Sequence, residues 1–251
     1  MKIAFVGSGS KGNATFILAE NVLIQIDCGL PRKRLVSALS PWGKTLDDVE
    51  AVFITHDHSD HIGTLAYLPK SVPVYSSPCS LPEEAIFETL EPYVGISIGS
   101  VSILPFAVSH DAPNPLNYII ACGNEKFGYV TDTGCLDDTA LSLLKDCDYY
   151  LFESNHDLRM LARSHRPPAL KKRIRGDHGH LNNVQSALYC AEVLGKKTKA
   201  VYLGHISEEC NTPEKAILTY RSVFADQGID VDSIDIIATK QHEVVYGGER
   251  E

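Results

Sequence analysis

The chain has 251 residues, of which 44% are hydrophobic and 22% charged, and its formal net charge is −9. This composition is typical of a soluble globular protein and argues against disorder, while the negative charge argues against a whole surface built for nucleic acid. The apolar runs are far shorter than the ~20 residues of a membrane span, and the N-terminus does not resemble a signal peptide, so we expect a cytoplasmic protein without membrane contact. The seven cysteines form no C-x-x-C pair and are expected to be reduced and mostly buried.

Short β-type runs and one helix open the chain. Strands are expected at 2–7, 14–20 and 22–29, the last apolar enough to be buried on both faces. Pro31 and the leucine spacing after it predict a helix over 31–40, because proline is favoured at the first turn of a helix. A strand at 49–55 follows, so strand, helix and strand alternate.

The alternation continues to the end of the chain. Strands or hairpins are expected at 72–77, 95–110, 116–122, 126–134, 149–155, 199–207 and 234–247, and helices at 81–90, 139–147, 182–194 and 212–228. This order fits an α/β protein with two sheets between helices, a four-layered αββα sandwich. No repeat or linker is visible, so we expect a single domain over 1–251.

The stretch "FITHDHSDHIG", from Phe53 to Gly63, places three histidines and two aspartates within six consecutive positions, His56 to His61. It follows an apolar strand, and α/β sheets usually hold their sites at the carboxyl ends of strands. Imidazole and carboxylate are ligands for zinc, manganese or iron. The pattern therefore predicts a site for divalent metal on a turn and the start of the next helix.

Three later strand ends offer further ligands, each directly after an apolar run: His110, Asp132 and His205. One turn alone cannot fill the coordination of two ions, so we expect these residues to complete it, with Asp132 as the bridging carboxylate. Asp27, in "IDCG" after another core strand, is expected to orient a ligand from behind.

The motif H-x-H-x-D-H, met by His56, His58, Asp60 and His61, resembles the signature of the metallo-β-lactamase superfamily. The resemblance covers essentially the whole chain and implies the αββα sandwich and two divalent ions, with zinc or manganese favoured and iron also possible. It also implies a division of ligands, with His56, His58 and His110 on one ion, Asp60, His61 and His205 on the other, and Asp132 between them.

Other motifs resemble the WalJ branch of this superfamily, also called YycJ or VicX, which comprises bacterial nucleases. They are "GSGSKGNAT", "IDCGL", "SHDAP", "ESNHD", "GHLNN" and "LGHIS", whereas "SHRPP" and "SEECN" depart from the branch. "GSGSKGN" lacks the spacing of a phosphate-binding P-loop and is expected to form a turn beside the metal site.

A phosphodiesterase reaction is implied by the same resemblance. Two close ions supply a metal-bound hydroxide at neutral pH as the nucleophile, but the leaving alkoxide also needs a proton. Related phosphodiesterases carry an acid relay of a motif aspartate, a strand-end glutamate and a loop histidine, which here match Asp60, Glu153 and His180. His180 is expected to donate to the leaving oxygen, held by Glu153.

A concentrated basic run from Arg159 to Arg175 holds seven lysines and arginines and no acid. Such residues contact a nucleic-acid backbone without reading its sequence, and the expected substrate is nucleic acid, with DNA favoured. Lys171, Lys172 and Arg173 are candidate substrate contacts. Asn182 is a fourth, because Asn182 or Asn183 is the candidate cap of a helix whose N-terminus would favour phosphate.

Other functions stay open at this point. The same metals could hydrolyse a small phosphodiester of the cyclic-nucleotide type, or another small ester, thioester or lactam, although a small neutral substrate does not need the basic run. Ribonuclease Z would need a tRNA-clamping arm, and a di-iron oxidoreductase would need a flavin domain, neither of which the sequence contains. A metal-binding regulatory protein would leave Glu153 and His180 without a role.

Overall fold

The computed structural model describes residues 1–78, 81 and 87–249. The chain divides into two compact units. Unit 1 comprises Met1–Ala107, Ala112–Asn124 and Lys240–Glu251, and unit 2 comprises Val108–Asp111 and Glu125–Thr239. The expectation of a single domain stays a prediction. Among the described residues, no helix combines the length and the apolar character needed to cross a membrane.

Unit 1 is built on a seven-stranded sheet with the order β14-β1-β2-β3-β4-β5-β6. The strands are β1 (Lys2–Gly7), β2 (Ala14–Ala19), β3 (Val22–Ile26), β4 (Ala51–Phe53), β5 (Val74–Ser76), β6 (Glu88–Thr89) and β14 (Val245–Gly248). The strands from β14 to β3 pair antiparallel, and those from β3 to β6 pair parallel. The carboxyl ends of β3 and β4 therefore lie at the same edge, which is where the histidine motif begins.

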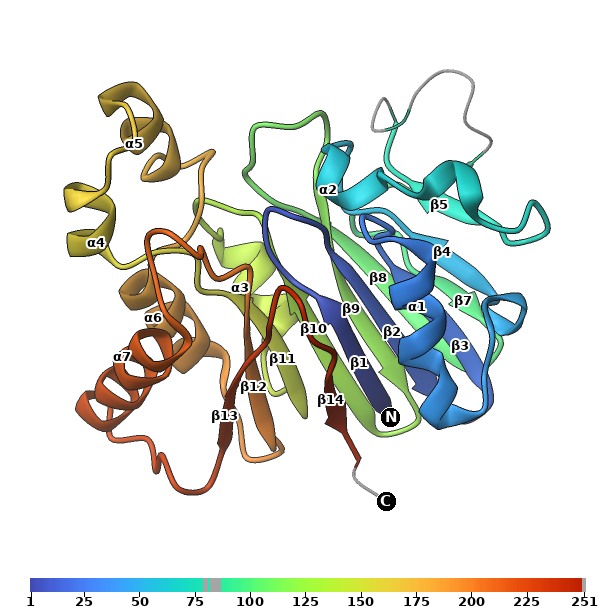
Figure 1. Cartoon of the computed structure of the whole chain (residues 1–251). Coiled ribbons are helices and arrows are strands. Elements are labelled where there is room, and N and C mark those ends of the chain that lie inside the picture. The colour runs from blue at the N-terminus through green and yellow to red at the C-terminus, as the bar shows by residue number, and fades with distance from the viewer. Residues whose placement is uncertain (79–80, 82–86, 250–251) are drawn as a thin grey trace. The chain divides into compact units, whose positions relative to one another are not determined.

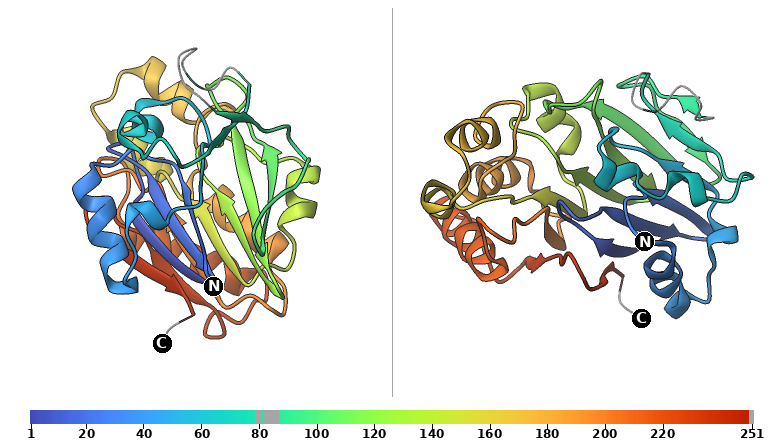
Figure 2. Two further views of the ribbon diagram at one scale, coloured as in Figure 1. Left: turned by 90° about the vertical axis from the view of Figure 1, so that its right-hand side faces the viewer. Right: turned by 45° about the horizontal axis from the view of Figure 1, so that its top comes forward.

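Helix α1 (Arg32–Leu39) makes the crossover between β3 and β4, as expected, and packs on this sheet (Figures 1 and 2). Its buried face consists of Leu35, Ala38 and Leu39, which join a core cluster with strand residues such as Leu23 and Val52. Each fully buried leucine contributes about 1.5–3 kcal/mol to folding. Short 3₁₀ turns follow at Ser40–Trp42, Leu46–Asp48 and Leu65–Tyr67.

Three more strands of unit 1 form an antiparallel meander: β7 (Ile96–Ile98), β8 (Val101–Ala107) and β9 (Leu116–Cys122). Tyr118 of β9 donates its hydroxyl hydrogen to the carbonyl oxygen of Ile54, and the amide of Leu116 donates to the carbonyl oxygen of Thr55, at 2.8 Å. These two bonds fix the backbone immediately before the histidine motif.

Unit 2 contains four parallel strands in the order β13-β12-β11-β10. They are β10 (Glu125–Val130), β11 (Tyr149–Glu153), β12 (Ala200–Gly204) and β13 (Asp235–Ala238), with the helices α3 (Asp138–Leu144), α4 (Leu158–Arg163), α5 (Pro168–Ile174), α6 (Asn183–Val193) and α7 (Pro213–Asp226). Every residue of β11 and β12 is buried, which explains why both strands are apolar apart from Glu153 at the end of β11. Helices α6 and α7 lie side by side (Figures 1 and 2).

Most expected elements are present, and two expectations need comment. The expected helix over 81–90 falls largely outside the described residues, and the described end of this segment, Glu88–Thr89, is the strand β6. The expected final run, 234–247, divides into two strands of different units, since β13 pairs with β12 whereas β14 pairs with β1. Local pattern cannot reveal this division, because strand partners are chosen by tertiary packing.

Candidate active site

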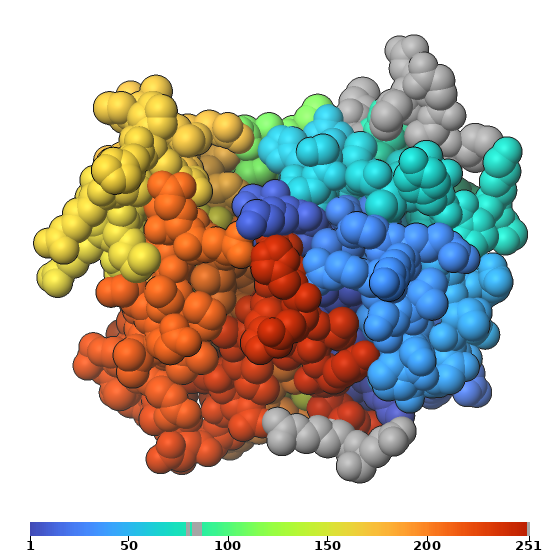
Figure 3. All heavy atoms as spheres, viewed as in Figure 1, coloured from blue at the N-terminus to red at the C-terminus, as the bar shows by residue number. Residues whose placement is uncertain are grey.

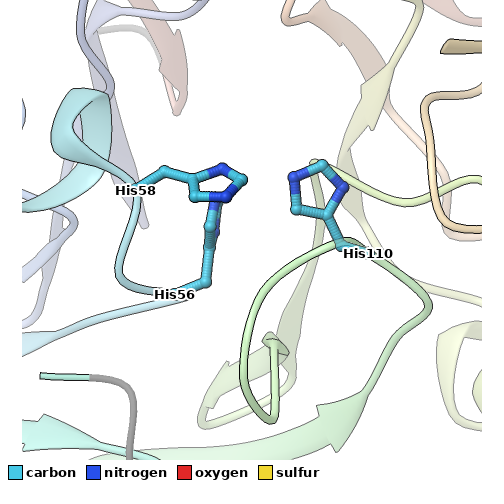
Figure 4. A group of neighbouring side chains, drawn as sticks. All are labelled: His56, His58 and His110. Carbon is cyan, nitrogen blue, oxygen red and sulfur yellow. The ribbon is translucent and has the colours of Figure 1, made fainter. Parts of the chain in front are cut away.

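The histidine motif of unit 1 lies at the end of β4, where the sequence placed it. His58 is the residue before the short helix α2 (Ser59–Ile62), which carries Asp60 and His61. The His56 ring lies 4.6 Å from the His58 ring and 4.0 Å from the His61 ring, centroid to centroid. Figure 4 shows His56 and His58 projecting from this loop, and His110 projecting from the loop after β8.

Asp27 and Thr55 orient two of these histidines from behind. Asp27 is fully buried, and its Oδ2 lies 2.8 Å from Nδ1 of His61. Its Oδ1 accepts hydrogen bonds from the Thr55 amide at 2.9 Å and the Thr55 hydroxyl at 3.0 Å. The Thr55 oxygen also lies 3.0 Å from Nδ1 of His56. Burial raises the pKa of Asp27, although His61 and Thr55 act in the opposite direction.

Asn13 is a site residue that sequence reasoning did not single out. It belongs to the turn "GSGSKGN", and its Nδ2 lies 2.9 Å from Nε2 of His61 and 3.2 Å from Oδ2 of Asp60. Its Oδ1 accepts from the amide of Gly9, so Nδ2 is the end that faces His61. Gly29 permits this close packing, since a Cβ there would lie 1.6 Å from the carbonyl oxygen of Asp60.

A second cluster of metal-ligand side chains lies in unit 2. Donor atoms of His110, Asp132 and His180 lie within 4.8 Å of one another, and so do those of Asp132, Glu153 and His205. Asp132 is common to both groups, and its carboxylate lies 2.9 Å from Nδ1 of His205. All but His180 are buried.

The backbone is strained at three of these strand ends. Asp27, Asp132 and His205 have φ angles of 58°, 47° and 49°, in the left-handed region that residues with a side chain rarely adopt. Each such residue costs about 1–3 kcal/mol, and such residues cluster at functional sites. Backbone strain at three predicted site positions therefore supports a functional role for them, since the surrounding structure must hold each one in this conformation.

Glu153 and His180 form a short polar contact within unit 2's cluster. Oε1 of Glu153 lies 2.6 Å from Nδ1 of His180. Its Oε2 accepts from the backbone amides of Thr133 at 2.9 Å and Leu181 at 3.4 Å. A carboxylate can only accept hydrogen bonds, so Nδ1 of His180 donates to Glu153, and Nε2 is the ring nitrogen available for proton transfer. Glu153 is fully buried, whereas the His180 side chain is 18% exposed.

The loop that carries His180 is packed against the loops of His110 and Asp132. Nδ1 of His110 donates to the carbonyl oxygen of Gly179 at 3.1 Å, and Ser109 contacts His178 at 2.9 Å. Gly134 is required here, because a Cβ would lie 2.3 Å from the carbonyl oxygen of Asp177. Burial lowers the pKa of His110, with Asp132 opposing, which favours the neutral ring that binds metal.

Comparison with known proteins identifies the family. The sequence model of the Beta-lactamase superfamily domain matches residues 21–206, well over half of the chain. The chain belongs to this superfamily. It is 30% identical to exodeoxyribonuclease YycJ of Bacillus anthracis, over 92% of each chain, and 32% identical to exodeoxyribonuclease WalJ of Streptococcus pneumoniae serotype 2, over 92% of this chain and 91% of the relative.

Solved structures agree on the fold. The metallo-β-lactamase fold protein YhfI of Bacillus subtilis matches with a TM-score of 0.71 at 15% identity, over 98% of this chain and 99% of that one. The expected αββα fold and the resemblance to the WalJ branch are thereby confirmed. Membership of the β-lactamase superfamily also confirms the expectation of a metal-dependent hydrolase, and the fold implies divalent ions.

The donor groups fit the metal that the superfamily implies. Nδ1 of His56 is hydrogen-bonded to Thr55 and Nδ1 of His110 to Gly179, which leaves Nε2 of each ring as the candidate coordinating nitrogen. In His61, Nδ1 is hydrogen-bonded to Asp27, and Nε2 lies 2.9 Å from Nδ2 of Asn13. The donors are imidazole and carboxylate only, which suits zinc, manganese and iron.

The four expected substrate contacts have different surroundings. Asn182 caps α6, accepting from the amides of Val184 and Gln185, so its oxygen already has a structural role. Lys171 donates to the carbonyl oxygens of Ala162 and Ser164, at 2.8 and 2.7 Å. Arg173 pairs with Asp111. Lys172 is exposed.

A buried polar network behind Glu153 was also missed. Ser186 donates to the carbonyl oxygen of Glu153, and Asn155 donates to that of His205 at 3.1 Å. Asn183 and Asn211 bond to each other at 3.0 Å. The sequence signal was the run "GHLNN", which was interpreted as a motif of the WalJ branch and as a helix start, without a buried network behind Glu153. These bonds hold the strand ends that carry Glu153 and His205.

Proposed function

We propose that this protein is a metal-dependent exodeoxyribonuclease that uses two divalent ions. The observation that carries the proposal is the buried Glu153 carboxylate holding Nδ1 of His180 at 2.6 Å, in a histidine side chain that is itself 18% exposed. A proton donor is needed for the alkoxide leaving group of a phosphodiester, and neither metals nor the histidine motif provide one. The YycJ and WalJ relatives, named exodeoxyribonucleases, support DNA as the substrate.

The resemblance to the superfamily carries the assignment of the metal ligands. We assign His56, His58 and His110 to one ion, Asp60, His61 and His205 to the other, and Asp132 to both. When bound, such ions lower the pKa of water and neutralise charge on the scissile phosphate. Asp27 and Thr55 would hold the histidines of unit 1 in the orientation that binds metal. Mutation of such supporting groups typically weakens metal binding 10–100-fold.

His180 would act as the general acid. Its Nδ1 proton is held by Glu153, so a proton on Nε2 makes the ring an imidazolium that the buried carboxylate stabilises. Transfer of the Nε2 proton to the leaving oxygen leaves a neutral ring that is still anchored by Nδ1. Asp60 is proposed as the third member of this relay, by analogy with related phosphodiesterases.

The proposal is tested by incubating protein loaded with manganese or zinc with end-labelled single- and double-stranded DNA, RNA and a bis-aryl phosphodiester. Release of mononucleotides from DNA ends is expected, and an Asp132→Asn variant should release none. Hydrolysis confined to the small diester would instead indicate a small-molecule phosphodiesterase. Protein that binds two metal ions per chain and hydrolyses none of these substrates would indicate a regulatory metal-binding protein.

A further inference from the structure

The basic run forms a distinct surface segment of unit 2, which we call the basic arm: residues 158–175, comprising α4, its connection and α5 (yellow in Figure 3). The arm contains seven of the chain's 23 lysines and arginines, and no aspartate or glutamate. In a chain with a net charge of −9, this is a strong local reversal of sign.

Three of the seven cations make hydrogen bonds or ion pairs that stabilise the conformation of the arm. Lys171 bonds the carbonyl oxygens of Ala162 and Ser164 at the end of α4, so it joins α5 to α4. Nε of Arg166 pairs with Glu209 at 2.9 Å. Arg173 pairs with Asp111, whose other oxygen lies 3.2 Å from Nε2 of His110.

A small core stabilises the arm from beneath. Leu161 of α4 and Ile174 of α5 are buried together with Cys210, and Leu170 packs on them. The arm is therefore a folded, supported element rather than a flexible basic tail.

The other four cations have no such structural role. Arg159, Arg163, Lys172 and Arg175 are exposed, and within the described part of the chain no ion pair involves them. Arg159 and Arg163 are four residues apart on α4, and Lys172 and Arg175 three apart at the end of α5, so each pair shares a helix face. Unpaired like charges held side by side on a rigid support repel one another, and a polyanion relieves this repulsion.

The chemistry of the arm selects a phosphate backbone rather than bases. The arm contains no Phe, Trp or Tyr, and stacking on aromatic rings is how proteins usually hold the bases of a single strand. A surface that offers cations but no aromatic ring contacts phosphates, without sequence preference. The arm also leads directly into the proposed acid: the amide of His180 donates to the carbonyl oxygen of Ile174 at 2.9 Å, and Gly176 closes the end of α5.

We propose that the basic arm binds the phosphodiester backbone of the DNA substrate through Arg159, Arg163, Lys172 and Arg175, while Lys171 and Arg173 hold the arm in shape. The inference rests on the proposed function for its choice of DNA over another polyanion. It changes the predicted contact set, because Lys171 and Arg173 become positioning residues. Both duplex and single-stranded DNA should bind, with the duplex showing the stronger salt dependence because its charge density is higher.

The test compares two quadruple variants of equal charge. The arm variant carries Arg159→Gln, Arg163→Gln, Lys172→Gln and Arg175→Gln. The control carries Arg32→Gln, Lys33→Gln, Lys196→Gln and Lys197→Gln, which are exposed cations outside the arm. Binding of the metal-loaded proteins to fluorescent, cleavage-resistant phosphorothioate DNA is measured by anisotropy from 50 to 200 mM salt.

Loss of four phosphate contacts should reduce the slope of log affinity against log salt by about 3.6 for duplex and 2.8 for single strands. Over this salt range the wild-type affinity for duplex should therefore fall about 150-fold more than that of the arm variant. The control should keep the wild-type slope. On cleavable DNA, the arm variant should lose far more kcat/KM than it loses on a bis-aryl phosphodiester, chiefly through a higher KM.

An arm variant with the wild-type slope, or a wild type that binds no DNA, would overturn the proposal. Should the quadruple variant not fold, the pairs Arg159/Arg163 and Lys172/Arg175 are changed separately, and each should remove about half of the slope change. A wild type that binds an acidic polypeptide with the same arm dependence, but not DNA, would identify an acidic protein partner instead. DNA binding that depends on the arm, without any hydrolysis, would reject the proposed function but retain the arm.

Discussion

The pairing of Glu153 with His180 permits a test in which the two substitutions Glu153→Gln and His180→Ala are compared on two kinds of leaving group. In wild-type protein, Glu153 accepts from His180 with one oxygen and from the amides of Thr133 and Leu181 with the other. Glutamine would keep its oxygen toward those two amides and turn its NH₂ group toward Nδ1. The substitution therefore forces His180 into the wrong tautomer and removes the charge that stabilises the imidazolium.

The expected magnitudes follow from the contacts. A hydrogen bond to a charged partner contributes about 1.5–3 kcal/mol, so Glu153→Gln should reduce kcat on DNA by roughly 10- to 150-fold. His180→Ala removes the general acid itself, which is worth about 10²–10⁴-fold. Both losses should be much smaller on a bis-aryl phosphodiester, because an aryl oxide departs without protonation. Glu192→Gln, at an exposed position of α6, is the matched control and should have no effect.

Steady-state turnover on both substrates, with metal content measured by atomic emission on the same preparations, checks this reasoning. Equal losses on DNA and on the aryl diester would refute the role of His180 in leaving-group protonation. Loss of bound metal in His180→Ala, in proportion to the loss of activity, would make His180 a metal ligand.

Four further predictions concern stability and metal binding. Asp27→Asn should weaken divalent-metal affinity about 10–100-fold in calorimetric titrations, because it removes the acceptor of the His61 Nδ1 hydrogen, and chelation of wild-type protein should lower its thermal midpoint. Asn182→Ala should lower the free energy of unfolding by about 1 kcal/mol in urea titrations, whereas Asn182→Ser should retain most of the cap. Burial lowers the pKa of His156 to about 4, and neither ring nitrogen has a hydrogen-bond partner among the described residues. In the unfolded chain the His156 ring has a pKa of about 6.5, so as the pH falls it binds a proton before the folded ring does. The free energy of unfolding should therefore decline by up to about 3 kcal/mol between pH 6.5 and 4. His156→Phe should flatten this decline, and an unchanged decline would contradict the assignment of the pH dependence to His156.

Much of the fold could be predicted because its elements have clear local signals. Strand β12 is apolar throughout and β11 is apolar up to its last residue, Glu153. Helix α7 begins with Pro213, and α6 is capped by Asn182, one of the two asparagines that the sequence offered for this role. The segment at 234–247 was not divided in advance into two strands of separate units. Its two halves have similar β-type patterns, and only their partners differ.

The residues of the candidate site also divide into those with a clear local signal and those that depend on tertiary packing. The sequence by itself determined the ligand-rich motif from His56 to His61 and its position after a strand, because the ligands are contiguous and the strand is apolar. The expectation that Glu153 holds His180 came from the resemblance, and not from any local pattern. Only the tertiary structure brought Asn13 to His61 across 48 residues, since such contacts depend on how strand ends and loops pack. It also decided which cations of the basic arm are used internally, because Lys171 and Lys172 are neighbours of the same type, and only the folded helix shows that one bonds α4 while the other is exposed.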